Sequence, residues 1–126
     1  MRNDVVRSGT MRRESSIRVS KDNGLVTIEV GGDLTASTLK DMDVAFQEAC
    51  GYNPSNILLK FGARSRINST GIAIIINLVI DSREKDYKVY LTGMSQHFRK
   101  IFQMVGLTRY ADIVESVDEI QAEEAD

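Results

Sequence analysis

The sequence stretch with the most distinctive chemistry is Asn68-Ser69-Thr70-Gly71, which places two hydroxyls before a glycine. One apolar run, 57–59, precedes this stretch, and a longer one, 72–80, follows it. We therefore expect a buried strand that leads through this turn into a buried helix. In open α/β sheets, ligands gather at strand-to-helix turns. Asn and Ser are also good helix N-caps, so a purely structural cap is a second interpretation.

No other stretch of the sequence indicates catalytic chemistry. Neither of the glycine-rich phosphate loops of nucleotide-binding enzymes is present. The single cysteine and single histidine exclude a disulfide framework and argue against a conventional zinc site. We interpret Cys50 as a small packed residue and His97 as solvent-exposed. The expectation is a protein that is not an enzyme, with no catalytic residue, no metal and no cofactor.

The composition is that of one ordinary domain. The chain has 126 residues, of which 42% are apolar and 27% charged, and this length suffices for a single core. A net charge of −2 gives no general reason to expect nucleic acid as a partner. We see no apolar signal segment at the N-terminus and no apolar run long enough to span a bilayer. We expect a cytoplasmic protein without a nucleic-acid or membrane partner.

Strand and helix patterns alternate after a first hairpin. The turn signal Asp22-Asn23-Gly24 separates two alternating apolar segments, so 16–31 is expected to be a β-hairpin. Further strands are expected at 56–61, 87–91 and 113–114, and helices at about 35–50, 70–85, 95–105 and from 116 onward. This order predicts one α/β domain with a mixed, mostly parallel sheet of about five strands, packed with about four helices.

The first two helices differ in their apolar patterns. In the first, Leu39, Met42, Phe46 and Ala49 lie on one face, and Gly51 is expected to end the helix. The helix after the hydroxyl turn has apolar residues on nearly all sides. Either it is buried on most sides, or part of it is an exposed contact surface.

The two ends of the chain differ in charge. Residues 1–13 hold four Arg, and residues 115–126 hold six acidic residues and no basic one. We interpret 1–14 as a flexible N-terminal tail, 15–122 as the folded domain, and 123–126 as an acidic C-terminal tail.

The order of the expected elements resembles the STAS family, which includes the anti-sigma factor antagonists. The resemblance covers about residues 15–122. It rests on Gly31-Gly32-Asp33-Leu34-Thr35, on the apolar strand 57–59, on 67–72, and on 98–107 with its Gly106-Leu107 ending. The combination of the hydroxyl turn with the late helix, at matching spacing, carries most of it.

The resemblance implies a switch controlled by phosphorylation. In anti-sigma factor antagonists the turn reads Asp-Ser-Ser-Gly, and the second Ser is phosphorylated by the partner anti-sigma factor, a serine/threonine kinase. The unphosphorylated antagonist binds that partner, and a phosphatase resets it. By position, Thr70 takes the phosphorylated place, with Ser69 as the alternative. The implied partner-binding residues are Asp33, Arg66, Asn68, Ser69, Thr70, Gly71, Ile72 and Ile75.

The sequence also departs from the family pattern. Asn68 replaces the usual Asp, Thr70 replaces Ser, and Lys60 lies where the family often has Asp. Arg64 and Arg66 make the preceding loop basic; they screen a phosphate, contact an acidic partner, or are ordinary solvated cations. A Thr in the switch position is also typical of the scaffold branch of the family, so an alternative is a scaffold that assembles with STAS paralogues. A small enzyme or ligand-binding domain that uses the turn as an anion site is a third hypothesis.

Overall fold

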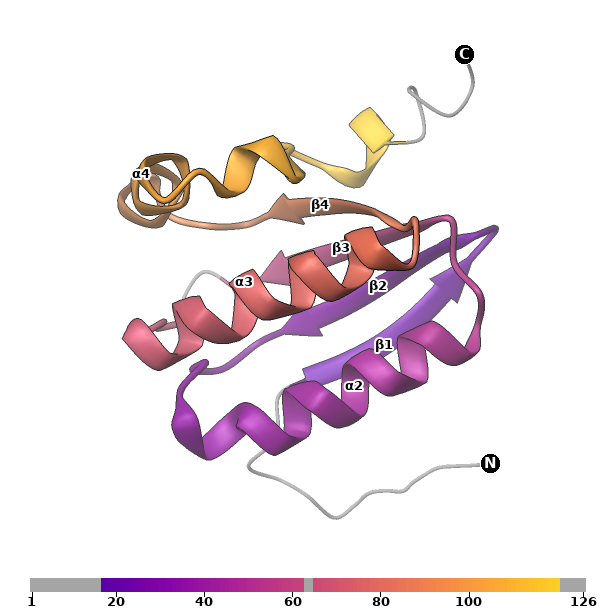
Figure 1. Cartoon of the computed structure of the whole chain (residues 1–126), viewed down its shortest axis with the longest axis horizontal. Coiled ribbons are helices and arrows are strands. Elements are labelled where there is room, and N and C mark those ends of the chain that lie inside the picture. The colour runs from indigo at the N-terminus through magenta and orange to yellow at the C-terminus, as the bar shows by residue number, and fades with distance from the viewer. Residues whose placement is uncertain (1–16, 63–64, 121–126) are drawn as a thin grey trace.

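A five-stranded sheet forms the centre of the structure, a computed structural model that describes residues 17–62 and 65–120 (Figure 1). The elements follow in the order β1 (Ile17–Asp22), β2 (Leu25–Val30), η1 (Ala36–Thr38), α2 (Leu39–Gly51), β3 (Asn56–Phe61), α3 (Ser69–Glu84), β4 (Lys88–Thr92), α4 (Gln96–Met104), η2 (Leu107–Arg109) and β5 (Ala111–Ile113). Residues 117–120 form one further helical turn.

The strand order in the sheet is the same as the order along the chain. Strands β1 and β2 pair antiparallel, and β2, β3, β4 and β5 pair parallel. The hairpin turns at Asn23 and Gly24, which both have positive φ, as the type I′ turn of a two-residue hairpin loop requires. The predicted fold class, with its N-terminal hairpin and mostly parallel sheet, is confirmed.

Helices α2 and α3 cover one face of the sheet (Figure 1). The apolar residues on that face of β2, β3 and β4 pack with the inner faces of both helices and with Phe102 of α4. A smaller cluster lies on the opposite face and consists of Leu25, Leu58, Tyr90, Val114 and Ile120. Strand β3 is thus buried on both faces, which explains its continuous apolar run.

Helix α2 differs from the prediction at its start and agrees with it at its end. Leu39 is 51% exposed, because the buried arc is centred between Met42 and Ala45 and the 100° step per residue leaves Leu39 at its edge. The helix ends at Gly51, as predicted, and the left-handed residue that follows the helix is Asn53, with φ of 51°. Asparagine tolerates this conformation better than most residues.

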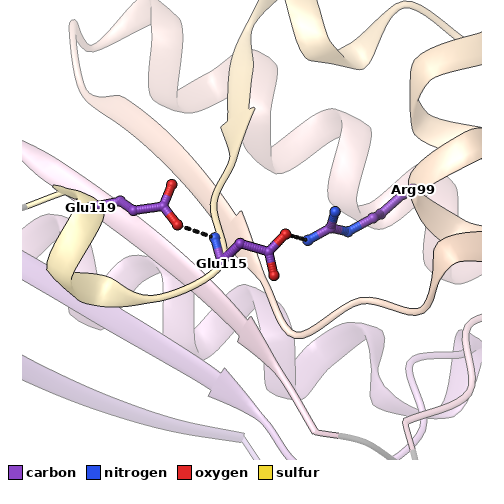
Figure 2. A network of polar contacts seen from close by, with 3 residues as sticks. All are labelled: Arg99, Glu115 and Glu119. Atoms are coloured by element: carbon purple, nitrogen blue, oxygen red, sulfur yellow. Dashed lines mark hydrogen bonds and ion pairs between the residues drawn. The ribbon is translucent and has the colours of Figure 1, made fainter.

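The start of the C-terminal segment is tied to α4 by a short polar network (Figure 2). The Arg99 guanidinium donates to the Glu115 carboxylate at 2.7 Å, and the Glu119 carboxylate accepts the Glu115 backbone N–H at 2.9 Å. Glu115 is largely exposed, so the ion pair orients the segment more than it stabilises the fold.

Candidate functional site

Helix α3 begins at the hydroxyl turn, and its cap is Asn68. The Asn68 backbone is extended, and its side-chain oxygen accepts the Gly71 N–H at 2.9 Å. Because Asn68 supplies the cap, the hydroxyls of Ser69 and Thr70 are not needed for it. Both residues stand in the first turn of the helix, and both are exposed.

Gly71 is required by its surroundings rather than by its backbone angles. A Cβ atom at this position would lie 2.2 Å from the carbonyl oxygen of Leu34 and 2.8 Å from Cγ2 of Ile67. No side chain fits in that space. The glycine therefore allows the start of α3 to pack directly on the loop that follows β2.

Three contacts join that loop to the residues just before the turn. The Leu34 N–H donates to the Arg66 carbonyl at 2.8 Å, and Leu34 forms a parallel bridge with Ile67. The Asp33 carboxylate accepts the Arg66 backbone N–H at 3.2 Å. Since β2 and β3 are neighbouring parallel strands, these contacts place Asp33, Arg66 and the hydroxyl turn together at the carboxyl edge of the sheet.

The structure thus brings most of the predicted partner-binding residues together. Asp33, Arg66, Asn68, Ser69 and Thr70 are exposed beside one another, Gly71 is the buried spacer, and Ile72 is half-buried. One residue does not fit the predicted role. Ile75 has no exposed surface and packs in the core under α3, so it cannot contact a partner directly.

The two other basic residues considered near the turn are Lys60 and Arg64. Lys60 is exposed and has the same alternation as Leu58, so it projects from the sheet face opposite α2 and α3. Arg64 lies outside the described residues.

An apolar stripe runs from the hydroxyl turn along the outer side of α3. Ala73 and Ile80 are exposed, and Ile72 and Ile76 are half-buried. We call these four residues the α3 stripe. Starting from Ser69, steps of three or four residues reach Ala73, Ile76 and Ile80 in turn, which places them in line with the turn. Both interpretations of this helix hold in part, because most of it is buried and one stripe is open.

The remaining candidate residues behave as expected. Cys50 packs partly buried against the core, and burial raises the pKa of its thiol above the ordinary value. His97 is exposed and makes an edge contact with the ring of Phe98. Within 17–62 and 65–120, no group of three or more His, Cys, Asp or Glu residues could hold a metal ion. None of the helices described there is long and apolar enough to cross a membrane.

Replacement of Gly71 by Ala should destabilise the protein by at least about 1–3 kcal/mol, because the added methyl group overlaps the Leu34 carbonyl. Gly51→Ala is the matched control, since a Cβ there meets no atom within 4 Å and the residue is helical. That variant should be unchanged or more stable. Urea unfolding measures both, and equal midpoints for the two variants would contradict the proposed close approach.

Loss of the Asn68 cap should cost about 1 kcal/mol in the free energy of unfolding, as measured for Asn68→Ala. Asn68→Asp should retain the stability, because a carboxylate oxygen accepts the same N–H and also favours the positive end of the helix. If Asn68→Asp loses as much stability as Asn68→Ala, the side chain does not act as the cap.

Comparison with known proteins places the chain in a family. No curated protein matches it. The structure is similar to the anti-sigma factor antagonist SpoIIAA in its unphosphorylated form, with 14% identity, a TM-score of 0.67, and coverage of 87% of this chain and 97% of that one. For SpoIIAA from Bacillus in its phosphorylated form, the values are 16%, 0.64, 88% and 100%.

A putative anti-sigma factor antagonist from Thermotoga maritima has 17% identity and a TM-score of 0.72, with coverage of 85% of this chain and 92% of that one. Identities this low establish the shared fold. The family model of the STAS domain matches residues 16–120, a range that contains every residue that the structure describes. The chain therefore belongs to the STAS domain family.

Proposed function

We propose that this protein is an anti-sigma factor antagonist, a regulatory cytoplasmic protein without catalytic activity. When unphosphorylated, it binds an anti-sigma factor that has serine/threonine kinase activity. Phosphorylation of Thr70 releases it, and a phosphatase restores binding. The observation that carries this proposal is the hydroxyl turn, in which Asn68 supplies the cap and leaves the Thr70 hydroxyl exposed.

The partner surface combines a polar edge with an apolar centre. Asp33, Arg66 and Thr70 form the exposed polar edge at the start of α3. The α3 stripe supplies the apolar part, and Ile80 is 43% exposed at its far end. Interfaces commonly have this composition, with an apolar core and a polar rim. Ile75 supports the stripe from below and is not part of the contact.

A phosphate on Thr70 would change this surface without unfolding the helix. It brings about −1.5 to −2 charges. At a helix N-terminus such a charge is favoured by free N–H groups and by the helix dipole. The cap residue Asn68 is neutral, so it does not repel the phosphate as a carboxylate would. The same charge next to an apolar partner surface must be desolvated, which opposes binding.

Incubation of the chain with its anti-sigma kinase and ATP should produce a phosphothreonine at Thr70, which mass spectrometry can locate. Thr70→Ala should abolish the modification, whereas Ser69→Ala should leave it in place, because both hydroxyls are exposed but only Thr70 takes the phosphorylated position of the family motif. Modification that is lost in Ser69→Ala instead assigns the switch to Ser69. Phosphate on neither residue would refute the switch.

A charge on the α3 stripe should weaken partner binding by tenfold or more, which corresponds to about 1.4 kcal/mol. Ala73→Glu is the test, because Ala73 is exposed and next to the turn. Val44→Glu is the control, since Val44 is also an exposed apolar helix residue but belongs to α2. Calorimetry with the purified partner should find the control unchanged. Equal losses in both variants would show that the stripe is not the contact.

The exposed stripe also favours a second candidate function. Apolar residues open to solvent on α3 could pair with other STAS chains, as in a stressosome-like scaffold that acts without catalysis. Light scattering separates the two functions. A very large assembly, formed alone or with a paralogue, supports the scaffold, and a monomer or dimer supports the soluble switch.

A further inference from the structure

A pocket of about 460 Å³ opens at the end of the sheet opposite the hydroxyl turn. It lies where β3 and β4 begin, and its lining includes Ser55, Asn56, Lys85, Asp86, Lys88 and Tyr90. The hydroxyl turn follows the other end of β3, so the two regions are separated by the length of that strand. The pocket is therefore a separate feature, and nothing inferred about it depends on the proposed switch.

Backbone hydrogen bonds fix the pocket wall to the sheet. The N–H groups of Ser55 and Asn56 both donate to the Gly24 carbonyl, at 3.0 and 3.2 Å. The Lys88 N–H donates to the Ser55 carbonyl at 3.0 Å. The segments that carry the lining side chains thus belong to the same rigid framework as β2, β3 and β4.

Asn56 is the unusual residue of this pocket. It is only 3% exposed, and its alternation with Leu58 places its side chain on the sheet face away from α2 and α3. Its carboxamide makes no hydrogen bond to any residue between 17 and 62 or between 65 and 120. Buried polar groups in native proteins are nearly always paired. A group bound in the pocket would supply the missing partner.

The charges around Asn56 indicate what kind of group this is. Lys85 and Lys88 contribute +2 and Asp86 contributes −1, which leaves the lining with a net charge of +1. The Lys88 ammonium lies 5.9 Å from the centre of the Tyr90 ring, at the border of the pocket. Ammonium and amide N–H groups are donors that pair well with a carboxylate.

We propose that this pocket binds a carboxylate group, which accepts a hydrogen bond from the Asn56 amide and pairs with Lys85 and Lys88. The carboxylate has two possible sources with the same chemistry. One is a free small organic acid. The other is the acidic sequence Glu123, Glu124 and Asp126, which follows Ile120. Ile120 is buried in the cluster that contains Tyr90, and Tyr90 lines the pocket.

The test is a titration of the full-length, ¹⁵N-labelled chain with succinate, with NMR detection of the Asn56 side-chain amide. We expect saturable shifts of that amide. Affinity should fall tenfold or more in the double variant Lys85→Gln, Lys88→Gln. It should be unchanged in the control Lys40→Gln, which removes an exposed lysine of α2. Shifts that do not saturate in either the wild type or the variant without acidic residues at 123, 124 and 126, or that are the same in the lysine double variant, overturn the proposal.

Two further arms identify the source and the class of the ligand. The first uses Glu123→Gln, Glu124→Gln, Asp126→Asn in the full chain. If succinate binds this variant and the wild type equally, the carboxylate is a free acid. If it binds only the variant, the chain itself supplies the carboxylate. The second arm replaces succinate by inorganic phosphate, and equally tight binding of phosphate would overturn the carboxylate assignment.

Asn56→Leu separates binding from stability. The variant should lose the succinate response, monitored by calorimetry. Its unfolding midpoint without succinate should not fall, because an unpaired buried amide has been replaced by an apolar group of similar size. Retained succinate binding in a folded Asn56→Leu variant would overturn the role of this side chain. Should that variant fail to fold, the lysine double variant still decides the proposal.

Discussion

The approach of the Leu34 carbonyl to Gly71 is the contact on which the hydroxyl turn depends. A Cβ atom at position 71 would lie only 2.2 Å from the Leu34 carbonyl oxygen, so only glycine fits there. Because the helix start can come so close, Leu34 can pair with Arg66 and Ile67, and Asp33 can reach the Arg66 N–H. The loops after β2 and β3 and the first turn of α3 therefore form one unit. A functional site supported in this way presents its side chains without prior rearrangement.

A second glycine constrains the same edge of the sheet. A Cβ at Gly93 would lie 2.1 Å from the Phe61 carbonyl, and Gly93 also has a positive φ of 85°. Thus the loop after β4 packs on the end of β3 just as α3 packs on the loop after β2. Backbone contacts and the Asn68 cap stabilise this edge, and the cap does not use the hydroxyls of Ser69 and Thr70. Exposed hydroxyls that are not needed for the fold can be modified without unfolding it.

Much of the fold could be predicted because its strongest patterns are local. The continuous apolar run of β3 and the turn signal at Asn23-Gly24 gave the correct strand and hairpin. The sequence could not show which side of α3 faces solvent, because the apolar residues lie on nearly all sides of this helix. The family resemblance gave Ile75 as a contact residue, and the apolar pattern alone could not separate this buried side chain from the half-buried Ile76. The pocket gave no local signal, because Asn56 only becomes unusual once packing has buried it.

Helix α3 runs from the hydroxyl turn to the pocket, and its packing determines whether binding at one of them affects the other. It begins at the hydroxyl turn, spans about 24 Å, and is followed directly by Lys85 and Asp86 of the pocket. Such a helix can couple the turn and the pocket energetically only if it has two stable positions. A shift of α3 towards the β2 loop would drive Gly71 into the Leu34 carbonyl, and a shift away would break the cluster around Ile75 and Val79. A shift of α3 in either direction is therefore costly. We expect ligand binding in the pocket and phosphorylation at the proposed switch not to affect each other.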